Sequence, residues 1–184
     1  MSALDPALER FATGRHVLVG DSLGTWVAVA AASINADRLE RLEALGDGAA
    51  LLGLTDVALS RLGLLAGADS RPARSLRATD AGEDRARTMR VAATSSTPAD
   101  VGAPGHVDVF ALGTTPAGVA AAHLATLAGT GLAVVLSVVV DELGHATPLQ
   151  DARTRPDLSR LAVAPAAQLA AAALVAQRPS ATAA

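Results

Sequence analysis

The sequence contains no cysteine, no lysine and no tyrosine, and its aromatic side chains are limited to two phenylalanines and one tryptophan. The absence of cysteine excludes disulfide bonds, thiolate metal sites and a cysteine nucleophile. Arginine supplies all 15 basic residues. Together with the excess of alanine, this pattern indicates a bias in the coding sequence, so it carries no functional conclusion.

The chain also lacks three features that would direct it to nucleic acid, to export or to a membrane. Its formal net charge of -3 and its pI of about 5.7 create no basic field for nucleic acid. Residues 1–11 include Asp5, Glu9 and Arg10 and have no apolar signal core. The longest strongly apolar run, residues 132–140, has about half of the ~20 residues that a membrane-spanning helix needs. We therefore expect a soluble, cytoplasmic protein whose partners include neither nucleic acid nor a membrane.

Hydrophobic periodicity predicts strands and helices that alternate along a single domain, residues 1–184. Expected strands are residues 17–19, 49–54, 107–112 and 132–140, and residues 26–32 fit either a strand or a helix. Expected helices are residues 4–12, 35–45, 55–62, 83–93, 116–128, 156–161 and 165–176. Residues 20–25, 67–82 and 95–105 are expected loops, and residues 177–184 are an expected disordered tail. This interleaving predicts an α+β fold, in which helices cover a mixed sheet in three layers, α/β/α.

Three short motifs carry the clearest pattern. Asp-Arg-Ala-Arg-Thr at residues 84–88 opens an expected helix, and Pro-Gly-His-Val at residues 104–107 forms a turn before an expected strand. Leu-Ala-Thr-Leu-Ala-Gly at residues 124–129 ends a further helix. In this order the motifs resemble those of the 3,4-dihydroxy-2-butanone-4-phosphate synthase family, and weaker similarity extends over residues 5–178. The resemblance implies the fold of that family and a homodimer with sites near its interface.

The resemblance also implies a reaction, the conversion of ribulose 5-phosphate into dihydroxybutanone phosphate and formate. In the family this reaction requires Mg²⁺, held by a glutamate and a histidine, and an acidic loop that shuttles protons. Enolising a sugar phosphate and moving its carbon skeleton need a Lewis acid and several acid or base groups. The implied reaction therefore depends on whether this chain has those groups.

Most of the groups that the family uses are replaced in this sequence. The acidic loop corresponds to residues 20–28, where Asp21 is the one carboxylate and Thr25 or its neighbour takes the place of the metal-binding glutamate. The metal-binding histidine corresponds to Ala117, and a glutamate of a late strand corresponds to the Ser-Val pair at residues 137–138. One aspartate and two hydroxyls are a poor ligand set for a hard cation. We therefore expect no metal site and no cofactor.

The same resemblance locates candidate site residues. Expected acid or base groups are Asp21, Asp84 and His106, and expected substrate-binding residues are Trp26, Thr25, Arg85, Thr88 and Phe110. A structural alternative stays open for several of them. Asp84 and Arg85 also suit the start of a helix, where Asp favours the macrodipole and Arg pairs with it. His106 also suits a bond to a backbone carbonyl, and Trp26 also suits a place in the core.

The other ionisable groups fit structural or solvated positions. We expect His123 to face solvent on its helix and His145 to lie in a turn before a proline. His16 stands beside the first strand without a visible partner, and the Asp-Glu pair at residues 141–142 is typical of a solvated turn. None of these groups is expected in the site.

The replaced groups favour a repurposed enzyme that works without a metal. Its pocket would keep the family's position but accept a bulkier and more apolar small-molecule substrate. The expected reaction is a cyclisation, isomerisation or similar rearrangement in specialised biosynthesis, catalysed by shape and a few acid or base groups. Two alternatives stay open: a non-catalytic pseudoenzyme that binds a metabolite or a partner, and an authentic Mg²⁺-dependent synthase of riboflavin biosynthesis.

Overall fold

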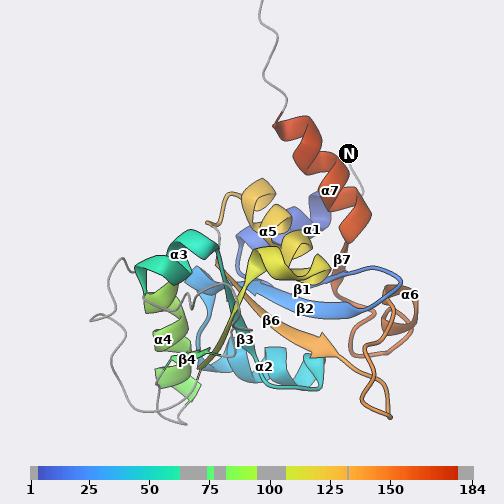
Figure 1. Cartoon of the computed structure of the whole chain (residues 1–184). Helices are drawn as coiled ribbons and strands as arrows, with labels where there is room; N and C mark the ends of the chain where they lie inside the picture. The colour runs from blue at the N-terminus through green and yellow to red at the C-terminus, as the bar shows by residue number, and fades with distance from the viewer. Residues whose placement is uncertain (1–3, 63–73, 77–81, 95–106, 132, 178–184) are drawn as a thin grey trace, which may run out of the picture.

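A mixed seven-stranded sheet is the centre of the computed structural model, which describes residues 4–62, 74–76, 82–94, 107–131 and 133–177 (Figure 1). The strands are β1 (Val17–Gly20), β2 (Thr25–Ala30), β3 (Leu51–Leu54), β4 (Arg74–Leu76), β5 (Val107–Ala111), β6 (Val134–Val139) and β7 (Ala162–Pro165). Their order in the sheet is β4-β5-β3-β6-β2-β1-β7. The β1/β7 and β3/β5 pairs are parallel, and the other pairs are antiparallel.

Helices cover both faces of this sheet and give the three layers that the sequence predicts (Figure 1). The helices are α1 (Asp5–Ala12), α2 (Ala36–Gly46), α3 (Asp56–Arg61), α4 (Gly82–Thr94), α5 (Pro116–Ala128), α6 (Leu149–Ala152) and α7 (Ala166–Ala176), with 3-10 turns η1 (Ala31–Ser33) and η3 (Leu112–Thr114). Buried side chains of α2, α3 and α4 form one apolar cluster with the sheet. Those of α1, α5 and α7 form a second cluster on the opposite face. The α+β prediction is confirmed.

Capping side chains explain where three of the helices begin. The Asn35 side chain accepts a hydrogen bond from the backbone of Arg38 at 2.9 Å, and the Thr55 side chain accepts one from Ala58 at 3.2 Å. Thr115 caps α5 in the same way, and Pro116 occupies the first turn. Each bond satisfies a backbone N–H that the helix itself leaves without a partner. These helices therefore start where the local sequence predicts.

The region after β6 differs from its prediction. The helix expected over residues 156–161 is wrong, because this segment forms turns in which Leu158 N–H donates to Arg155 O at 3.1 Å and Leu161 N–H donates to Leu158 O at 2.9 Å. Neither α6 nor β7 was predicted. The sequence of β7, Ala-Val-Ala-Pro, has no strand pattern of its own, and its parallel pairing with β1 decides its structure. Residues 26–32, left open between strand and helix, form β2 and η1.

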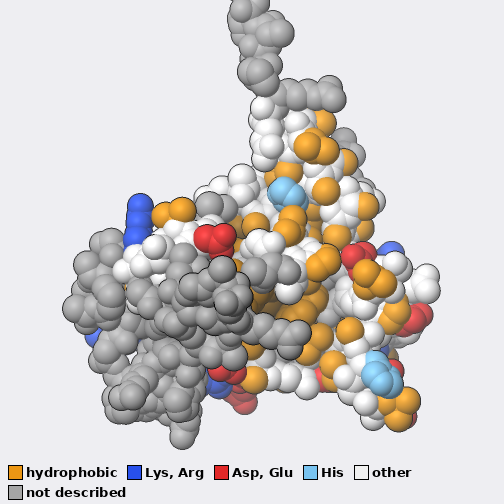
Figure 2. Space-filling view, in the orientation of Figure 1, with side chains coloured by type: hydrophobic (Ala, Val, Ile, Leu, Met, Phe, Trp, Pro, Cys, Tyr) orange, Lys and Arg blue, Asp and Glu red, His pale blue; other side chains and the backbone are white. Residues whose placement is uncertain are grey.

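The last helix carries exposed apolar side chains. In Figure 1, α7 extends beyond the sheet, and in Figure 2 hydrophobic side chains follow this helix. Leu174 and Val175 are 66% and 68% exposed. The longest described helices, α4 and α5, have 13 residues, and no helix in the described segments has the length and hydropathy to cross a membrane. The disordered tail expected after residue 177 lies outside the described residues.

Candidate functional site

Two cavities lie on either side of the turn that joins β1 to β2. The first has a volume of about 270 Å³, and Trp26 and Ala117 are in its wall. The second has a volume of about 310 Å³ and is lined by residues of α6 and the start of α7. Asp21 lines both cavities and is the one ionisable residue among the described residues that line the first. The wall of the first cavity comprises Gly20, Asp21, Leu23, Gly24, Trp26, Thr115, Pro116, Ala117, Ala146 and Ala166.

Hydrogen bonds within the turn fix the position of Asp21. Its Oδ1 accepts from the backbone N–H of Leu23 at 2.7 Å and of Gly24 at 3.3 Å, and its own N–H donates to Gly24 O at 3.0 Å. Its carbonyl accepts from Leu149 N–H at 2.8 Å, which ties the turn to α6. Oδ2 makes no hydrogen bond with the described chain. One oxygen therefore holds the carboxylate in place, and the other is available to a ligand.

Strand geometry separates two residues that the sequence places together. Side chains alternate between the faces of a strand. Trp26 packs with the cluster of α1, α5 and α7, and it lines the cavity beside Ala117. Thr25 shares the opposite face with Val27, which belongs to the cluster of α2, α3 and α4. Thr25 therefore does not line the Trp26 cavity.

The Thr25 side chain is fully buried, and its hydroxyl has no hydrogen-bond partner among the described residues. Its backbone pairs with Gly20 across the hairpin and with Val139 of β6. A buried hydroxyl without a partner costs about 1–3 kcal/mol. Thr25 is consequently a position of unfavourable burial next to the turn, on the side away from the indole.

Phe110 lies in β5 and is half-buried in the same apolar cluster as Trp26. It covers Gly53 of β3, where a Cβ would lie 2.9 Å from Phe110 Cζ and would overlap Leu112 Cδ2. Glycine at position 53 thus leaves the space that the side chains of Phe110 and Leu112 occupy. Phe110 lines neither cavity at the β1–β2 turn.

Three further predicted residues, Asp84, Arg85 and Thr88, belong to α4 on the face opposite Trp26. Arg85 donates two hydrogen bonds to the Glu43 carboxylate of α2, at 3.2 and 2.5 Å. Asp84 is half-buried in the first turn, and Thr88 is buried against the core. The structure therefore does not bring these residues to the β1–β2 turn. His106 lies outside the described residues.

The pKa of the Glu43 carboxyl reflects its interaction with Arg85. Burial raises the pKa of Glu43, but the hydrogen bonds from Arg85 and from the backbone N–H of Ala50 outweigh it, so that the pKa lies below its usual value. The net direction means that the charged pair is favoured over the neutral acid. The Arg85 guanidinium thus joins α4 to α2.

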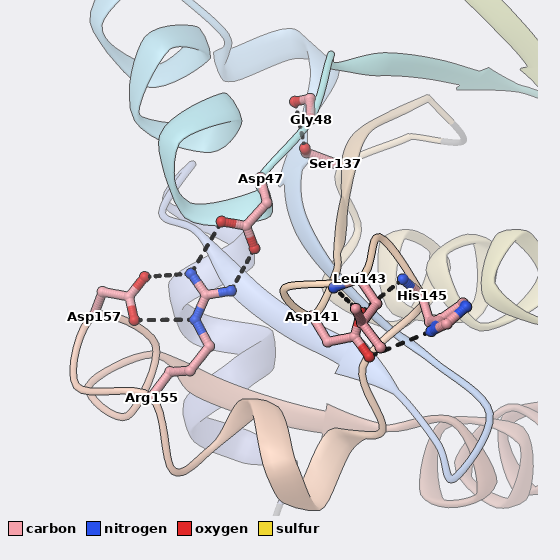
Figure 3. A network of polar contacts seen from close by, with 8 residues as sticks. All are labelled: Asp47, Gly48, Ser137, Asp141, Leu143, His145, Arg155 and Asp157. Atoms are coloured by element: carbon pink, nitrogen blue, oxygen red, sulfur yellow. Dashed lines mark hydrogen bonds and ion pairs between the residues drawn. The ribbon is translucent and has the colours of Figure 1, made fainter.

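The residues at the positions that the resemblance assigns to the family's metal-binding histidine and late-strand glutamate do not fit Mg²⁺. Ala117 lines the cavity but offers no donor atom. Ser137 is fully buried on the α2 side of β6, and its hydroxyl donates to Gly48 O at 2.8 Å (Figure 3). Mg²⁺ needs near-octahedral oxygen ligation that includes carboxylates. The described segments contain no cluster of three or more histidine or carboxylate side chains that could hold a metal.

Asp141 is used within its own turn, as Figure 3 shows. Its Oδ1 accepts from the backbone N–H of Leu143 at 2.9 Å and of His145 at 2.8 Å, and Oδ2 lies 3.6 Å from His145 Nδ1. The bond from the His145 backbone is the largest cause that lowers the pKa of Asp141 below its usual value. All of these groups are exposed, in agreement with the solvated turn that the sequence predicts.

The sequence could not identify several residues that shape the site. Thr115, Ala146 and Ala166 come from three distant segments and line the cavity with small side chains, which leave no motif. Arg155 is another residue whose role the sequence could not show. It forms ion pairs with both Asp47 and Asp157 and so connects the turns after α6 to the end of α2 (Figure 3). Neither arrangement is visible before the chain folds.

Comparisons with known proteins agree with the family resemblance found in the sequence. The family model for 3,4-dihydroxy-2-butanone 4-phosphate synthase matches residues 5–172. A two-domain 3,4-dihydroxy-2-butanone 4-phosphate synthase from A. baumannii is similar in structure, with a TM-score of 0.76 and 20% identity over 91% of this chain. The present chain spans 56% of that protein's length.

Two single-domain structures are similar over nearly their whole length. A 3,4-dihydroxy-2-butanone 4-phosphate synthase in complex with two magnesium ions gives a TM-score of 0.75 at 19% identity, covering 96% of this chain and 98% of that one. The corresponding synthase of Candida albicans gives 0.72 at 24% identity, covering 94% and 97%. Curated protein sequences give no significant match. At these identities the structural similarity establishes the fold.

Proposed function

Because this chain belongs to the 3,4-dihydroxy-2-butanone 4-phosphate synthase family, we propose that it is a repurposed member, an enzyme that rearranges a bulkier and more apolar small molecule without Mg²⁺. The observation that carries the proposal is the cavity of about 270 Å³ at the β1–β2 turn. An indole and three alanines stand in its wall, and Asp21 is its one ionisable residue within the part of the chain that the structure describes. Such a wall suits an apolar ligand better than a sugar phosphate and a hydrated cation.

Asp21 can act as the acid or base of this site. Its anchored Oδ1 fixes the carboxylate, and its free Oδ2 can take a proton from one atom of the ligand and return it to another. An isomerisation or cyclisation of this kind needs no oxidant or other reactant. The apolar wall, including Trp26, orients the ligand and excludes water.

The second cavity gives the ligand room to extend. It has a volume of about 310 Å³ and shares Gly20, Asp21 and Ala166 with the first. Together the two cavities fall within the size of ordinary small-molecule sites, which is roughly 300–1,000 Å³. We expect the reacting atom of the ligand to lie beside Asp21, where the cavities meet.

A homodimer is part of the proposal. The family that the sequence resembles is homodimeric, and Val119, Leu174 and Val175 expose apolar surface on α5 and α7. A second copy of this chain would cover that surface. The cytoplasmic location expected from the sequence stays a prediction.

A non-catalytic binding protein is the second candidate. The β1–β2 turn also supports this candidate. Asp21 Oδ1 accepts two backbone hydrogen bonds there, so the residue has a structural role even if it takes part in no reaction. The two candidates share the cavity and differ in whether Asp21 exchanges a proton with the ligand.

The first experiment measures formate release from ribulose 5-phosphate with Mg²⁺. The proposal predicts no release above a control without protein. Formate production at a rate that depends on protein and Mg²⁺ would show an authentic synthase and overturn the proposal.

The second experiment tests the cavity with N-phenyl-1-naphthylamine, an uncharged apolar probe, by energy transfer from Trp26. Ala117→Leu fills the cavity and should weaken binding about tenfold, equal to ~1.4 kcal/mol. Ala44→Leu is the control, because Ala44 is exposed on α2 away from the cavity. Equal probe affinities in both variants and the native protein would contradict the assigned site.

The third experiment separates the two candidates. A metabolite extract is incubated with the native protein and with Asp21→Asn, and its components are followed by mass spectrometry. Asn keeps the oxygen that accepts from Leu23 and Gly24 but cannot exchange a proton. Conversion of a component by the native protein alone supports the enzyme, whereas retention by both proteins without conversion supports the binding protein.

A further inference from the structure

A cavity with a polar lining lies at the end of β1 opposite the Asp21 cavity. This cavity of about 500 Å³ opens beside Gly14, Arg15 and His16, which precede the strand, between the end of α1 and the first turns of α2. Asp21 follows the strand, so the two regions are separated by roughly 16 Å of extended chain. The cavity is lined by Arg10, Gly14, Arg15, His16, Asn35, Asp37, Arg38, Arg41 and Leu161.

This cavity concentrates positive charge in a chain whose net charge is -3. Of the described residues that line it, four are arginines and one, Asp37, carries a carboxylate. Other arginines of the described chain, such as Arg85 and Arg155, pair with carboxylates. The four arginines of the cavity make no ion pair within the described segments. No carboxylate of the described segments therefore lies within ion-pair distance of these four guanidinium groups.

Two of the arginines are held in place by the backbone. Arg38 donates to Ser33 O, and Arg10 donates to Arg160 O at 3.2 Å. Gly14 has a φ of +71°, and a Cβ there would overlap Ser33 Cβ and lie 2.8 Å from Arg38 Nη1. The chain can therefore pass close to Arg38 only with glycine at this position.

The other two arginines, Arg15 and Arg41, are exposed, and their guanidinium groups make no hydrogen bond with the described chain. Arg38 and Arg41 lie three residues apart, on the same side of α2. Two anchored and two free guanidinium groups therefore share one cavity. The anchored pair fixes the geometry, and the free pair can close on a ligand.

His16 forms the floor of the cavity. It is 7% exposed, and its Nε2 lies 2.9 Å from Arg38 O, a geometry in which Nε2 donates the proton to the carbonyl. The sequence shows no partner for His16, and the structure corrects this expectation. Burial lowers the pKa of His16, the Arg38 carbonyl opposes that change, and the charges of Arg41 and Arg38 lower the pKa further. An anion among the arginines would therefore raise it.

We propose that this cavity binds a phosphorylated small molecule, whose phosphoryl group lies among Arg10, Arg15, Arg38 and Arg41. Guanidinium groups bind phosphate through paired, charge-assisted hydrogen bonds, and several of them can share one phosphoryl group. The volume exceeds that of a phosphate ion, and Asn35 and Asp37 offer polar groups to the rest of the ligand. This site is separate from the Asp21 cavity, and it stands or falls independently of the proposed function.

The test is calorimetric titration of the full chain with inorganic phosphate and pyrophosphate. Pyrophosphate binding is expected, and Arg41→Ala or Arg15→Ala should weaken it about tenfold or more. Arg87→Ala is the matched control, because Arg87 is exposed on α4 and its loss changes the net charge equally. Circular dichroism verifies that each variant is folded.

A proton NMR titration of His16 supplies an independent readout. The pKa of His16 should rise when pyrophosphate is bound, and it should not respond in Arg41→Ala. Three outcomes would overturn the proposal: no binding at millimolar pyrophosphate, equal affinity in Arg41→Ala and Arg87→Ala, or tighter binding of citrate than of pyrophosphate. The last outcome would assign the cavity to carboxylates instead.

Discussion

The ion pair between Arg85 and Glu43 gives the sharpest test of whether a motif residue serves the fold or a ligand. The guanidinium donates two hydrogen bonds to the carboxylate, and the two side chains are 21% and 27% exposed. Glu43 Oε1 also accepts from the backbone N–H of Ala50 at 3.0 Å. Arg85→Ala would leave this half-buried carboxylate without its counter-charge.

The expected loss follows from the burial of the pair. Exposed ion pairs contribute about 0–1 kcal/mol, whereas hydrogen bonds to charged groups contribute about 1.5–3 kcal/mol. Because about a quarter of each side chain is exposed, Arg85→Ala should lower the free energy of unfolding by about 1.5–2 kcal/mol. In a double-mutant cycle with Glu43→Ala, the coupling energy should be about 1 kcal/mol.

The assay is urea unfolding followed by the fluorescence of Trp26, the one tryptophan, which lies in β2 on the other face of the sheet. Arg87→Ala is the control and should change stability by less than ~0.5 kcal/mol. The pKa of Glu43 is lowered in the folded protein, so the pair stabilises fully above the unfolded carboxyl's pKa and loses its effect as pH falls through the folded value. The difference between native and Arg85→Ala protein should therefore shrink in acid.

A coupling energy below ~0.3 kcal/mol, with Arg85→Ala as stable as Arg87→Ala, would refute this reasoning. Arg85 would then not stabilise the fold, and the ligand-binding role that the family resemblance implies would better explain why arginine stands at this position. The experiment thus decides between the two interpretations that the sequence leaves open.

Three further substitutions test the packing around the sheet. Gly46→Ala should cost about 1–3 kcal/mol in urea unfolding, because the added Cβ would overlap Ser137 Oγ and lie 3.0 Å from the Ser137 carbonyl carbon. Gly48→Ala is the control, since its nearest neighbour would lie 3.8 Å away, and an equal cost at both sites would contradict this packing. Thr25→Val should leave stability unchanged or raise it by about 1 kcal/mol, because it removes a buried hydroxyl without a partner; a loss above ~1 kcal/mol would show that the hydroxyl has one. Arg155→Ala should lower stability by about 1 kcal/mol and speed proteolysis of the turns after α6, and unchanged proteolysis would show that its ion pairs do not hold them.

Local signals were enough to predict most of the elements. Asn35 and the Thr-Pro pair at residues 115–116 mark helix starts that the structure confirms, because capping bonds form within three residues of the chain. The short β7 could not be predicted, because pairing with β1 makes it a strand and its alanines alone suggest a helix. The turns at residues 156–161 depend on Arg155, whose partner Asp47 lies 108 residues away.

The candidate site could be predicted less completely. The family resemblance implies a shared site for Ala117 and the neighbourhood of Thr25, and the structure does bring Ala117 beside Trp26. The face on which each side chain lies was not available from the motifs, since it follows from the register of β2 against β1 and β6. Arg85 and its partner Glu43 are 42 residues apart, so the motif alone could not show that the guanidinium is engaged.

The way this fold is stabilised explains how the family's carboxylates could be lost without losing the architecture. Two apolar clusters hold the helices to the sheet, and ion pairs such as Arg85–Glu43 join helix to helix. The β1–β2 turn is held mainly by backbone groups and by Asp21 Oδ1, which bonds to its own turn. Further carboxylates at this turn would contribute charge repulsion rather than stability, so the fold does not need them. The architecture at this end of β1 therefore does not depend on the chemistry of a site there, so family membership establishes the fold and leaves the reaction to be tested.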